Sequence, residues 1–245
     1  MDFEVNRIEP GLWRWTVPHP EWTPEKGVPG GWGQQVGCVY HEGADAVVLI
    51  DPLVPPNGTP EQDRFWRALD EDVERLGLPV AVLLANWYHV RSAREVRERY
   101  AQPRGSSVWA HEEARSHLAA GVVTRFFRFD DTLPGGVHAL AASGLNPDET
   151  VFWIPARATL VVADAILGAG NGELRIAPPS WAVKGPQGRE RYDREFKPQL
   201  RALLDLPCER VLVAHGPPVL ASGRDALLRA LESPPWGSES AQKIE

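Results

Sequence analysis

The sequence predicts an α/β (α+β) protein built as a four-layer αββα sandwich, with two facing sheets and helices outside. Two patterns indicate this architecture. Between residues 80 and 121, short apolar runs alternate with helical segments, as in parallel strand–helix–strand units. Later, residues 150–154 and 159–164 are apolar runs joined by the linker PARA, which is typical of a hairpin in a second sheet. Two sheets that each have helices on one face pack against each other by their other faces.

In the first half of the chain, several short apolar runs have the length and side-chain pattern of strands. They are residues 11–17, 36–41, 46–51, 80–84 and 107–110. Helices are expected after the third, fourth and fifth runs. Two of these helices begin with a capping box, formed by Thr59 with Gln62 and by Ser92 with Glu95, and the third ends at Gly121.

The second half is predicted to form the second sheet and two more helices. Its expected strands are residues 126–129, 137–141, 150–154, 159–164, 174–177 and 210–214. One helix lies within residues 191–204, where Pro198 must be near its start or kink it. The other, residues 224–231, has Ser222 as its cap.

A long loop rich in glycine and proline separates the first two strands, over residues 18–33, and carries His19, Trp22 and Trp32. Long loops in compact domains often have a function. Two interpretations follow from the aromatic residues. The indoles pin the loop to the surface by burying their rings, or the loop overhangs a site.

The composition describes a globular chain of 245 residues, with 43% hydrophobic residues, 24% charged residues and a net charge of −7. We predict a single domain over residues 1–232 and a disordered polar tail over residues 233–245. No basic stripe points to nucleic acid. No apolar run is long enough for a membrane helix, and the N-terminus lacks a secretion signal, which predicts a cytoplasmic protein without a membrane partner.

Several catalytic motifs are missing from the sequence. It has no Gly-x-Ser-x-Gly elbow, no phosphate-binding glycine loop with lysine and no Cys-x-x-Cys. Cys38 and Cys208 lie in apparent strands and are expected to be small core residues. The serine hydrolase, nucleotide triphosphatase and dithiol redox classes therefore lack their usual residues.

The most informative stretch is the apolar run over residues 80–84, followed by Asn86-Trp87-Tyr88-His89-Val90-Arg91 and then the helix that starts near Ser92. A polar hinge between a buried strand and a helix is where active sites of layered α/β proteins are found. We therefore expect the functional residues to lie in and around this hinge.

The order of these elements resembles the metallo-β-lactamase fold. The resemblance covers residues 8–232 and depends on the hinge region and three short blocks, VVLIDP at residues 47–52, VVADAI at 161–166 and VLVAHG at 211–216. Members of that superfamily carry a His-x-His-x-Asp-His motif in the hinge, a later histidine, an aspartate that bridges two metals, and a last histidine. Asp164 and His215 match the last two of these positions.

The chain departs from the other motif positions. Aligned without gaps, these positions hold Asn86, Tyr88, Val90 and Arg91, none of which is a usual zinc ligand. With two residues deleted, His89 takes the place of the last histidine of the motif and Tyr88 that of its aspartate. The later histidine position falls near Leu145, again not a ligand. The resemblance also places Asp51 where an aspartate braces the metal loop; the alternative is that Asp51 accepts backbone hydrogen bonds at a strand end.

The resemblance therefore implies a degraded metal site. The expected cofactor is none or a single zinc ion, held by His89, Asp164 and His215. The alternative is that Asp164 and His215 hydrogen-bond each other without a metal. In either case their polar atoms should lie within about 8 Å of each other, close enough to share a hydrogen-bond network.

Two classes of function remain open. The first is a hydrolase-like protein that acts on or binds a small anionic ligand, with Asp164, His215 and His89 as the catalytic residues. Its ligand-binding residues would be Arg91, Tyr88, Asn86 and Trp87. The second is a non-catalytic, metal-free binding or scaffold descendant of the fold. For Arg91 an ion pair with Glu95, four residues on, is an equal alternative.

Overall fold

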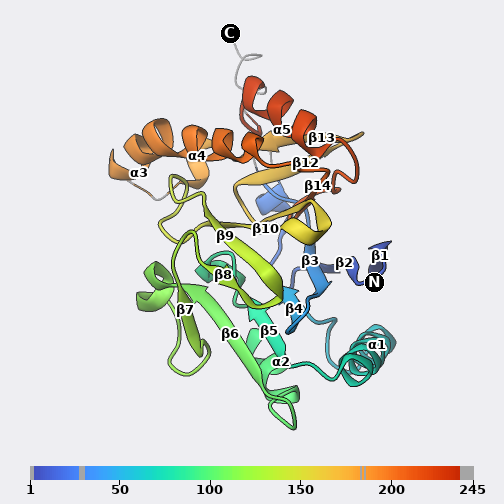
Figure 1. The fold of residues 1–245 in the computed structure, drawn as a ribbon. Coiled ribbons are helices and arrows are strands. Elements are labelled where there is room, and N and C mark those ends of the chain that lie inside the picture. The colour runs from blue at the N-terminus through green and yellow to red at the C-terminus, as the bar shows by residue number, and fades with distance from the viewer. Residues whose placement is uncertain (1–2, 28–30, 183, 185, 238–245) are drawn as a thin grey trace.

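The computed structural model describes residues 3–27, 31–182, 184 and 186–237. The larger of its two main sheets has seven strands, which lie side by side in the order in which they occur in the chain (Figure 1). They are β1 (Glu4–Glu9), β2 (Leu12–Pro18), β3 (Gln35–Glu42), β4 (Val47–Ile50), β5 (Val80–Leu83), β6 (Ser106–His111) and β7 (Arg125–Phe127). Strands β1 to β4 are antiparallel neighbours, whereas β4 to β7 are parallel. Helix α1 (Pro60–Leu76) connects β4 with β5, and α2 (Ala93–Arg99) connects β5 with β6.

The smaller sheet has five strands in the order β14 (Arg210–Val213), β11 (Thr159–Val162), β10 (Thr150–Ile154), β9 (Val137–Ala141) and β8 (Thr132–Leu133). Only the pair β11 and β14 is parallel in this sheet. Strands β12 (Ile166–Gly170) and β13 (Glu173–Ile176) form a separate hairpin. Helices α3 (Pro186–Arg191), α4 (Lys197–Ala202) and α5 (Gly223–Glu232) follow, with a π-helical turn (Tyr192–Phe196) between α3 and α4.

Short 3-10 helices occupy several connections. They are η1 (Pro24–Gly27), η2 (Trp87–His89), η3 (Glu112–Ser116), η4 (Pro134–Gly136), η5 (Pro155–Arg157), η6 (Pro179–Trp181) and η8 (Leu203–Asp205). The turn η2 is important for the site, because it compacts the hinge between β5 and α2.

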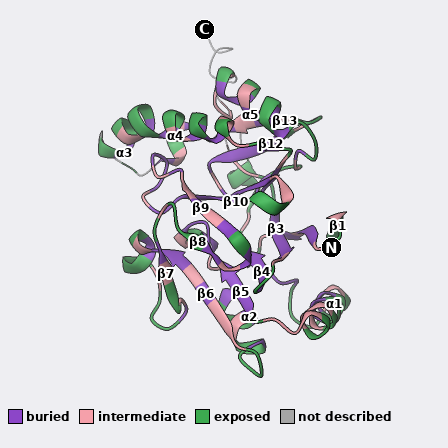
Figure 2. Ribbon diagram, viewed as in Figure 1, coloured by how far each residue is buried: buried purple, intermediate pink, exposed green. Residues whose placement is uncertain are grey.

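The buried apolar residues form three clusters, and many of the buried residues lie on the strands (Figure 2). Between the two sheets, Ile50 and Leu83 of the larger sheet meet Phe152 and Val161 of the smaller one. A second cluster joins the outer face of the larger sheet to α1 and α2. A third joins the outer face of the smaller sheet to α4, α5 and the β12–β13 hairpin. The predicted α/β class with helices outside two facing sheets is confirmed. Among the described helices, none is long and apolar enough to cross a membrane.

The sequence patterns at helix starts are only partly reliable. Thr59 caps α1 as predicted, since its hydroxyl accepts a hydrogen bond from the Gln62 N–H at 3.2 Å. Ser92 precedes α2 but makes no side-chain cap; its hydroxyl instead accepts a hydrogen bond from Val54 N–H at 3.0 Å. Ser222 precedes α5 without capping it, because its backbone is in the left-handed region at φ 54°. Tertiary contacts and backbone shape decide which serine acts as a cap.

Several other expectations need correction. Residues 126–129 were expected in the second sheet, but β7 pairs with β6 in the larger sheet. The third helix predicted in the first half of the chain, which was expected over residues 112–120 and to end at Gly121, is the short η3. Strands β1 and β12 were not predicted, because β1 is largely exposed and polar and β12 is rich in glycine.

The helical run that contains Pro198 starts earlier than expected and is not broken. Proline lacks an N–H and its ring collides with the carbonyl group four residues before it. Here the π-helical turn immediately precedes Lys197 and Pro198, which lie in the first turn of α4. A π-turn widens the helix by one residue, and this spacing accommodates the proline within a continuous helical segment.

Part of the predicted tail is described. Trp236 donates a hydrogen bond from its indole to the carbonyl oxygen of Gly31 at 2.9 Å, and its backbone N–H donates to Ile176. The first bond connects the segment after α5 to the loop before β3, and the second connects it to β13. Residues 238–245 lie outside the described part of the chain.

Candidate functional site

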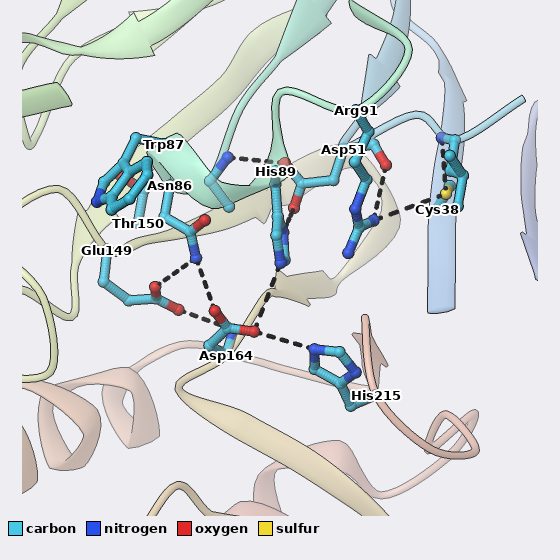
Figure 3. A network of polar contacts seen from close by, with 12 residues as sticks. Cys38, Asp51, Asn86, Trp87, His89, Arg91, Glu149, Thr150, Asp164 and His215 are labelled. Carbon is cyan, nitrogen blue, oxygen red and sulfur yellow. Dashed lines mark hydrogen bonds and ion pairs between the residues drawn. The ribbon is translucent and has the colours of Figure 1, made fainter. Parts of the chain in front are cut away.

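Four strand ends bring polar side chains together at one edge of the two sheets (Figure 3). Strands β4 and β5 lead into Asp51 and Asn86, and strands β11 and β14 lead into Asp164 and His215. Each of these two strand pairs is parallel, so its carboxyl ends lie side by side. Ligand sites of α/β proteins form outside such ends. The expected proximity of Asp164 and His215 is confirmed, since Nε2 of His215 lies 3.0 Å from Oδ1 of Asp164.

Asp164 lies at the centre of this group. Its Oδ1 accepts a hydrogen bond from Nε2 of His215 at 3.0 Å, and Nε2 of His89 lies 3.5 Å from the same oxygen. Its Oδ2 accepts a hydrogen bond from Nδ2 of Asn86 at 3.0 Å. The Asp164 side chain is 17% exposed, against 6% for His89 and 7% for His215. The carboxylate thus holds two buried imidazoles and still reaches the surface of a pocket.

His89 is fixed from its other side by Asp51. Nδ1 of His89 lies 2.8 Å from Oδ2 of Asp51, while Oδ1 of Asp51 accepts a hydrogen bond from Ala85 N–H at 2.8 Å. Asp51 therefore both braces the hinge and accepts a backbone hydrogen bond, so the two interpretations from the sequence hold together. The imidazole of His89 lies between two carboxylates, which fixes the orientation of its ring.

Arg91 is next to His89 in a strained backbone conformation. Its φ is 36° and that of Asp51 is 49°, in the left-handed region that residues other than glycine rarely adopt. Nη1 of Arg91 donates to the carbonyl oxygen of Asp51 at 3.0 Å and lies 3.9 Å from Sγ of Cys38. Among the described residues, these are its bonding partners rather than Glu95. Such strain persists where the surroundings fix it, and it is concentrated at functional sites.

Glu149 is a buried member of this group that the sequence analysis missed. Its Oε1 accepts hydrogen bonds from the backbone N–H groups of Asp164 and Ala165, both at 2.9 Å. Its Oε2 accepts from Nδ2 of Asn86 at 2.8 Å. One amide group thus holds two carboxyl groups together. The sequence signal that could have found it is the pair Asp148-Glu149 directly before an apolar strand. Acidic side chains are rarely buried unless a partner compensates their charge.

The two aromatic residues of the hinge stack on each other and take different positions relative to the pocket. The ring of Trp87 stacks on Tyr88 at 3.6 Å and on His117 at 4.8 Å between centroids. Its backbone N–H donates to Asp148 at 2.6 Å. Tyr88 is 57% exposed and lines the pocket described below, whereas Trp87 lies behind it. Leu145, at the position of the superfamily's later histidine, is buried in the core.

The turn that presents His215 is supported by a buried arginine. Arg14 on β2 donates from Nε and Nη2 to the carbonyl oxygen of Val213, and from Nη2 to that of Gly216 at 3.0 Å. A side chain at Gly37 would collide with this guanidinium, since its Cβ would lie 2.3 Å from Arg14. Glycine at position 37 therefore gives Arg14 the space to hold the His215 turn.

The charges of the central groups follow from their surroundings. Burial and Arg91 oppose the charged form of His89, but the carboxylates of Asp51 and Asp164 outweigh them and raise its pKa to about 9. Burial would raise the pKa of Asp164, yet His89 and His215 hold it well below its usual range. Burial lowers the pKa of His215 below its ordinary value, although Asp164 opposes this. At neutral pH the site therefore contains a charged His89, a charged Asp164 and a neutral His215.

The pKa of the deeper carboxyl group of Glu149 is shifted in the opposite direction from that of Asp164. Burial and the neighbouring charge of Asp164 raise the pKa of Glu149 well above its usual value, even though Asn86 donates a hydrogen bond to it. Burial likewise raises the pKa of Asp148 to about 6. The shift favours the protonated form of Glu149 beside the charged Asp164, and a proton on Glu149 lessens the repulsion between the two carboxyl groups.

A pocket of about 370 Å³ opens above Asp164 and His215. It is lined by His19, Glu21, Lys26, Trp32, Tyr88, His89, Arg91, Asn146, Asp164, Trp181 and His215. A larger pocket of about 730 Å³ lies between β1 and α1, but it contains none of the polar residues at the four strand ends. We therefore place the candidate site in the smaller pocket, where the pKa shifts and the strained backbone coincide.

The donor atoms fit one metal ion. Among the described residues, one ligand atom each from His89, Asp164 and His215 lies within 4.8 Å of the others. Nδ1 of His89 faces Asp51, which is how a carboxylate commonly orients a metal-binding histidine. A metal ion would have to replace the proton that Nε2 of His89 carries when the ring is charged. The described residues offer no second such set, because Asn86, Tyr88 and Leu145 stand at other motif positions.

Comparison with known proteins gives the fold. No family model and no curated protein sequence matches this chain. Many solved structures do. The DIM-1 metallo-β-lactamase exposed to ceftazidime has a TM-score of 0.62 and 12% identity, covering 95% of this chain and 97% of that one.

Two other structures extend this similarity. A β-lactamase domain protein from Burkholderia ambifaria has a TM-score of 0.64 and 14% identity, over 93% of this chain and 75% of that one. A metallo-β-lactamase family protein from Thermus thermophilus has a TM-score of 0.57 and 18% identity, over 92% and 80%. The chain therefore has the metallo-β-lactamase fold, as the resemblance in its sequence predicted.

Proposed function

We propose that this chain is a hydrolase-like protein of the metallo-β-lactamase fold with a degraded metal site. It retains at most one metal ion, on His89, Asp164 and His215, and acts on or binds a small anionic ligand. The observation that carries this proposal is the convergence of those three side chains within 4.8 Å beside the guanidinium of Arg91. A bound zinc ion would supply a Lewis acid that polarises an oxygen atom of the ligand.

The catalytic roles follow from the contacts of each side chain. Asp164 accepts a hydrogen bond from Nε2 of His215 and so fixes the tautomer and orientation of this ring. The low pKa of His215 keeps the ring neutral, and a neutral ring can accept a proton. His89 is positively charged when no metal is bound, and it lines the same pocket.

The ligand-binding roles belong to the other hinge residues. Arg91 supplies a fixed positive charge at the pocket, held in a strained conformation by Asp51 (Figure 3). Tyr88 forms part of the pocket wall, and Trp87 supports Tyr88 by stacking behind it. Asn86 holds Asp164 in place through its amide group, and its Oδ1 is buried without a hydrogen-bond partner among the described residues.

A metal-free binding protein is the second candidate, favoured by the position of His89. The charged imidazole already lies between the carboxylates of Asp51 and Asp164, where it balances negative charge as a metal ion would. The site is therefore electrostatically complete without an ion. The content of bound metal distinguishes the two candidates.

We expect the purified protein to contain less than one zinc per chain by elemental analysis. Zinc titration of chelator-treated protein should saturate at no more than one ion per chain, because only one set of donor atoms converges. His89→Gln and His215→Gln should abolish the binding, whereas His138→Gln on β9, outside the pocket, should leave it unchanged. Two tightly bound ions per chain would overturn the proposed degraded site.

We expect Arg91→Ala to weaken the binding of phosphate and small carboxylates by about tenfold, since a charge-assisted hydrogen bond contributes roughly 1.5 kcal/mol. Ligand binding is measured by calorimetric titration, with the melting temperature recorded in parallel because Arg91 also holds Asp51. Arg94→Ala, which removes an exposed arginine of α2, is the matched control. Unchanged affinity in Arg91→Ala would show that the ligand does not contact this residue.

A further inference from the structure

The pocket above Asp164 has walls of aromatic rings. Trp32 comes from the loop before β3, Trp181 from η6 and Tyr88 from the hinge, and all three line it. Both indoles are half-buried, and the phenol ring is 57% exposed. The exposed parts of aromatic rings at the wall of a pocket can contact a ligand.

The two indoles flank the histidine of the site. The ring of Trp32 lies 5.2 Å from that of His215 at an angle of 54°, and the ring of Trp181 lies 6.0 Å from it at 82°. Aromatic rings at these separations interact favourably in tilted and edge-on arrangements. His215 is therefore bordered by two indoles from segments far apart in the sequence.

Trp32 is held in this position by its own loop. The indole N–H of Trp22 donates to the carbonyl oxygen of Trp32 at 2.8 Å, and the ring of His19 packs edge-on against Trp32 at 5.2 Å. Nζ of Lys26 lies 5.7 Å from the Trp32 ring. Trp22 thus pins the loop, whereas Trp32 lines the pocket of the site. The sequence offered two interpretations of this loop, one in which its indoles hold it to the surface and one in which it overhangs a site. The first describes Trp22 and the second describes Trp32.

Two positively charged side chains line the same pocket as the aromatic rings. Lys26 and Arg91 line the pocket, and their charges can face an anion between the aromatic walls. The acidic residues that line it are Glu21 and Asp164, and Asp164 is already paired with His89 and His215. Because Trp32, Trp181 and Tyr88 line the same pocket as Arg91, a group attached to an anion at Arg91 can contact these rings.

We infer that the ligand of this site is an aromatic anion, namely a carboxylate or phosphate attached to a flat ring, with its charge at Arg91 and its ring against Trp32 and Trp181. This inference rests on the proposed anion-binding function and narrows it. A flat ring makes face and edge contacts with indoles that a saturated ring of similar size makes less well.

The test compares flat and saturated rings that carry the same charged group. Calorimetric titration with benzoate and cyclohexanecarboxylate, and with phenyl phosphate and cyclohexyl phosphate, measures the preference for a flat ring within each pair. We expect a preference of roughly tenfold, the effect of contacts with two indoles. Trp32→Leu and Trp181→Leu should each reduce this preference to about threefold or less, and Trp32→Phe should restore part of it.

Two controls separate this inference from the wider proposal. Trp109→Leu, which changes a half-buried indole of β6 outside the pocket, should keep the full preference. Inorganic phosphate tests anion binding alone. If saturated and flat rings bind equally well, or if neutral benzyl alcohol binds as well as benzoate, the inference of an aromatic anionic ligand is wrong. Equal binding of saturated and flat rings would still leave the proposed anion-binding function in place. If no anion binds, both fail.

Discussion

Asp164→Ala is expected to lower the free energy of unfolding by about 3 kcal/mol, because it leaves several buried polar groups without a partner. The carboxylate accepts hydrogen bonds from His215 and Asn86 and balances the charge of His89. Its removal leaves a charged imidazole with Asp51 as its remaining carboxylate. Urea denaturation at pH 7 in the presence of a chelator measures this loss without any effect of metal.

Two further variants show whether the charge or the contacts are responsible. Asp164→Asn preserves the shape of the side chain but removes its charge, so we expect it to lose less stability than Asp164→Ala. Asp131→Ala removes an exposed carboxylate that accepts a hydrogen bond from Arg128 N–H, and it should change stability by about 0.5 kcal/mol or less. If Asp164→Ala changes the free energy of unfolding by no more than Asp131→Ala does, the network around Asp164 does not stabilise the fold.

The sequence predicts the fold well where apolar patterns and local chemistry agree. Strands β9 and β10 begin and end as expected, and Thr59 caps α1. The failures have physical causes. β1 owes its strand conformation to pairing with β2 rather than to its own exposed residues. Ser92 and Ser222 stand before helices but do not cap them, because a distant N–H or a left-handed backbone determines their role.

The candidate site was predictable where a residue matches the fold, and less so elsewhere. Asp164 and His215 follow recognisable strands, and their contact at 3.0 Å agrees with the expectation from sequence. The place of His89 could not be decided from spacing alone, because the turn η2 compacts the hinge and brings this ring to Asp164. Glu149 was missed since its partners, Asn86 and the backbone of Asp164, are far away in the sequence.

The stability of the metal-free protein is expected to fall as the pH rises from 7 to 9.5. The pKa of His89 is raised to about 9, so its stabilising effect is complete below the ordinary value of 6.5 and is lost as the pH rises through 9. Glu149 acts in the same direction, because its pKa is raised well above the usual value and its ionisation in the buried site is unfavourable. Both groups bind more protons in the folded state than in the unfolded state.

Two buried thiols act in the same direction at the upper end of this range, because burial raises the pKa of Cys38 and of Cys208 to about 11, above the unfolded value. The groups that titrate at lower pH act outside it. The pKa of Asp164 is lowered, so its stabilising effect is complete above the ordinary value of 3.8 and is lost only as the pH falls through the lower folded value. His215 has a lowered pKa, so the cost of keeping it neutral is felt below pH 6.5. Asp148, at about 6, has already lost most of its proton at pH 7.

His89 alone should account for a loss of about 2 kcal/mol between pH 7 and 9.5, given its displacement from the unfolded value. Urea denaturation of the chelator-treated protein at several pH values measures this slope. His89→Gln should be less stable at pH 7 and should lose about 2 kcal/mol less than the parent over this range, because glutamine does not ionise. His138→Gln on β9 should retain the slope of the parent. If the parent and His89→Gln lose the same stability over this range, His89 does not carry its charge between Asp51 and Asp164, and the electrostatic account of a site complete without metal fails.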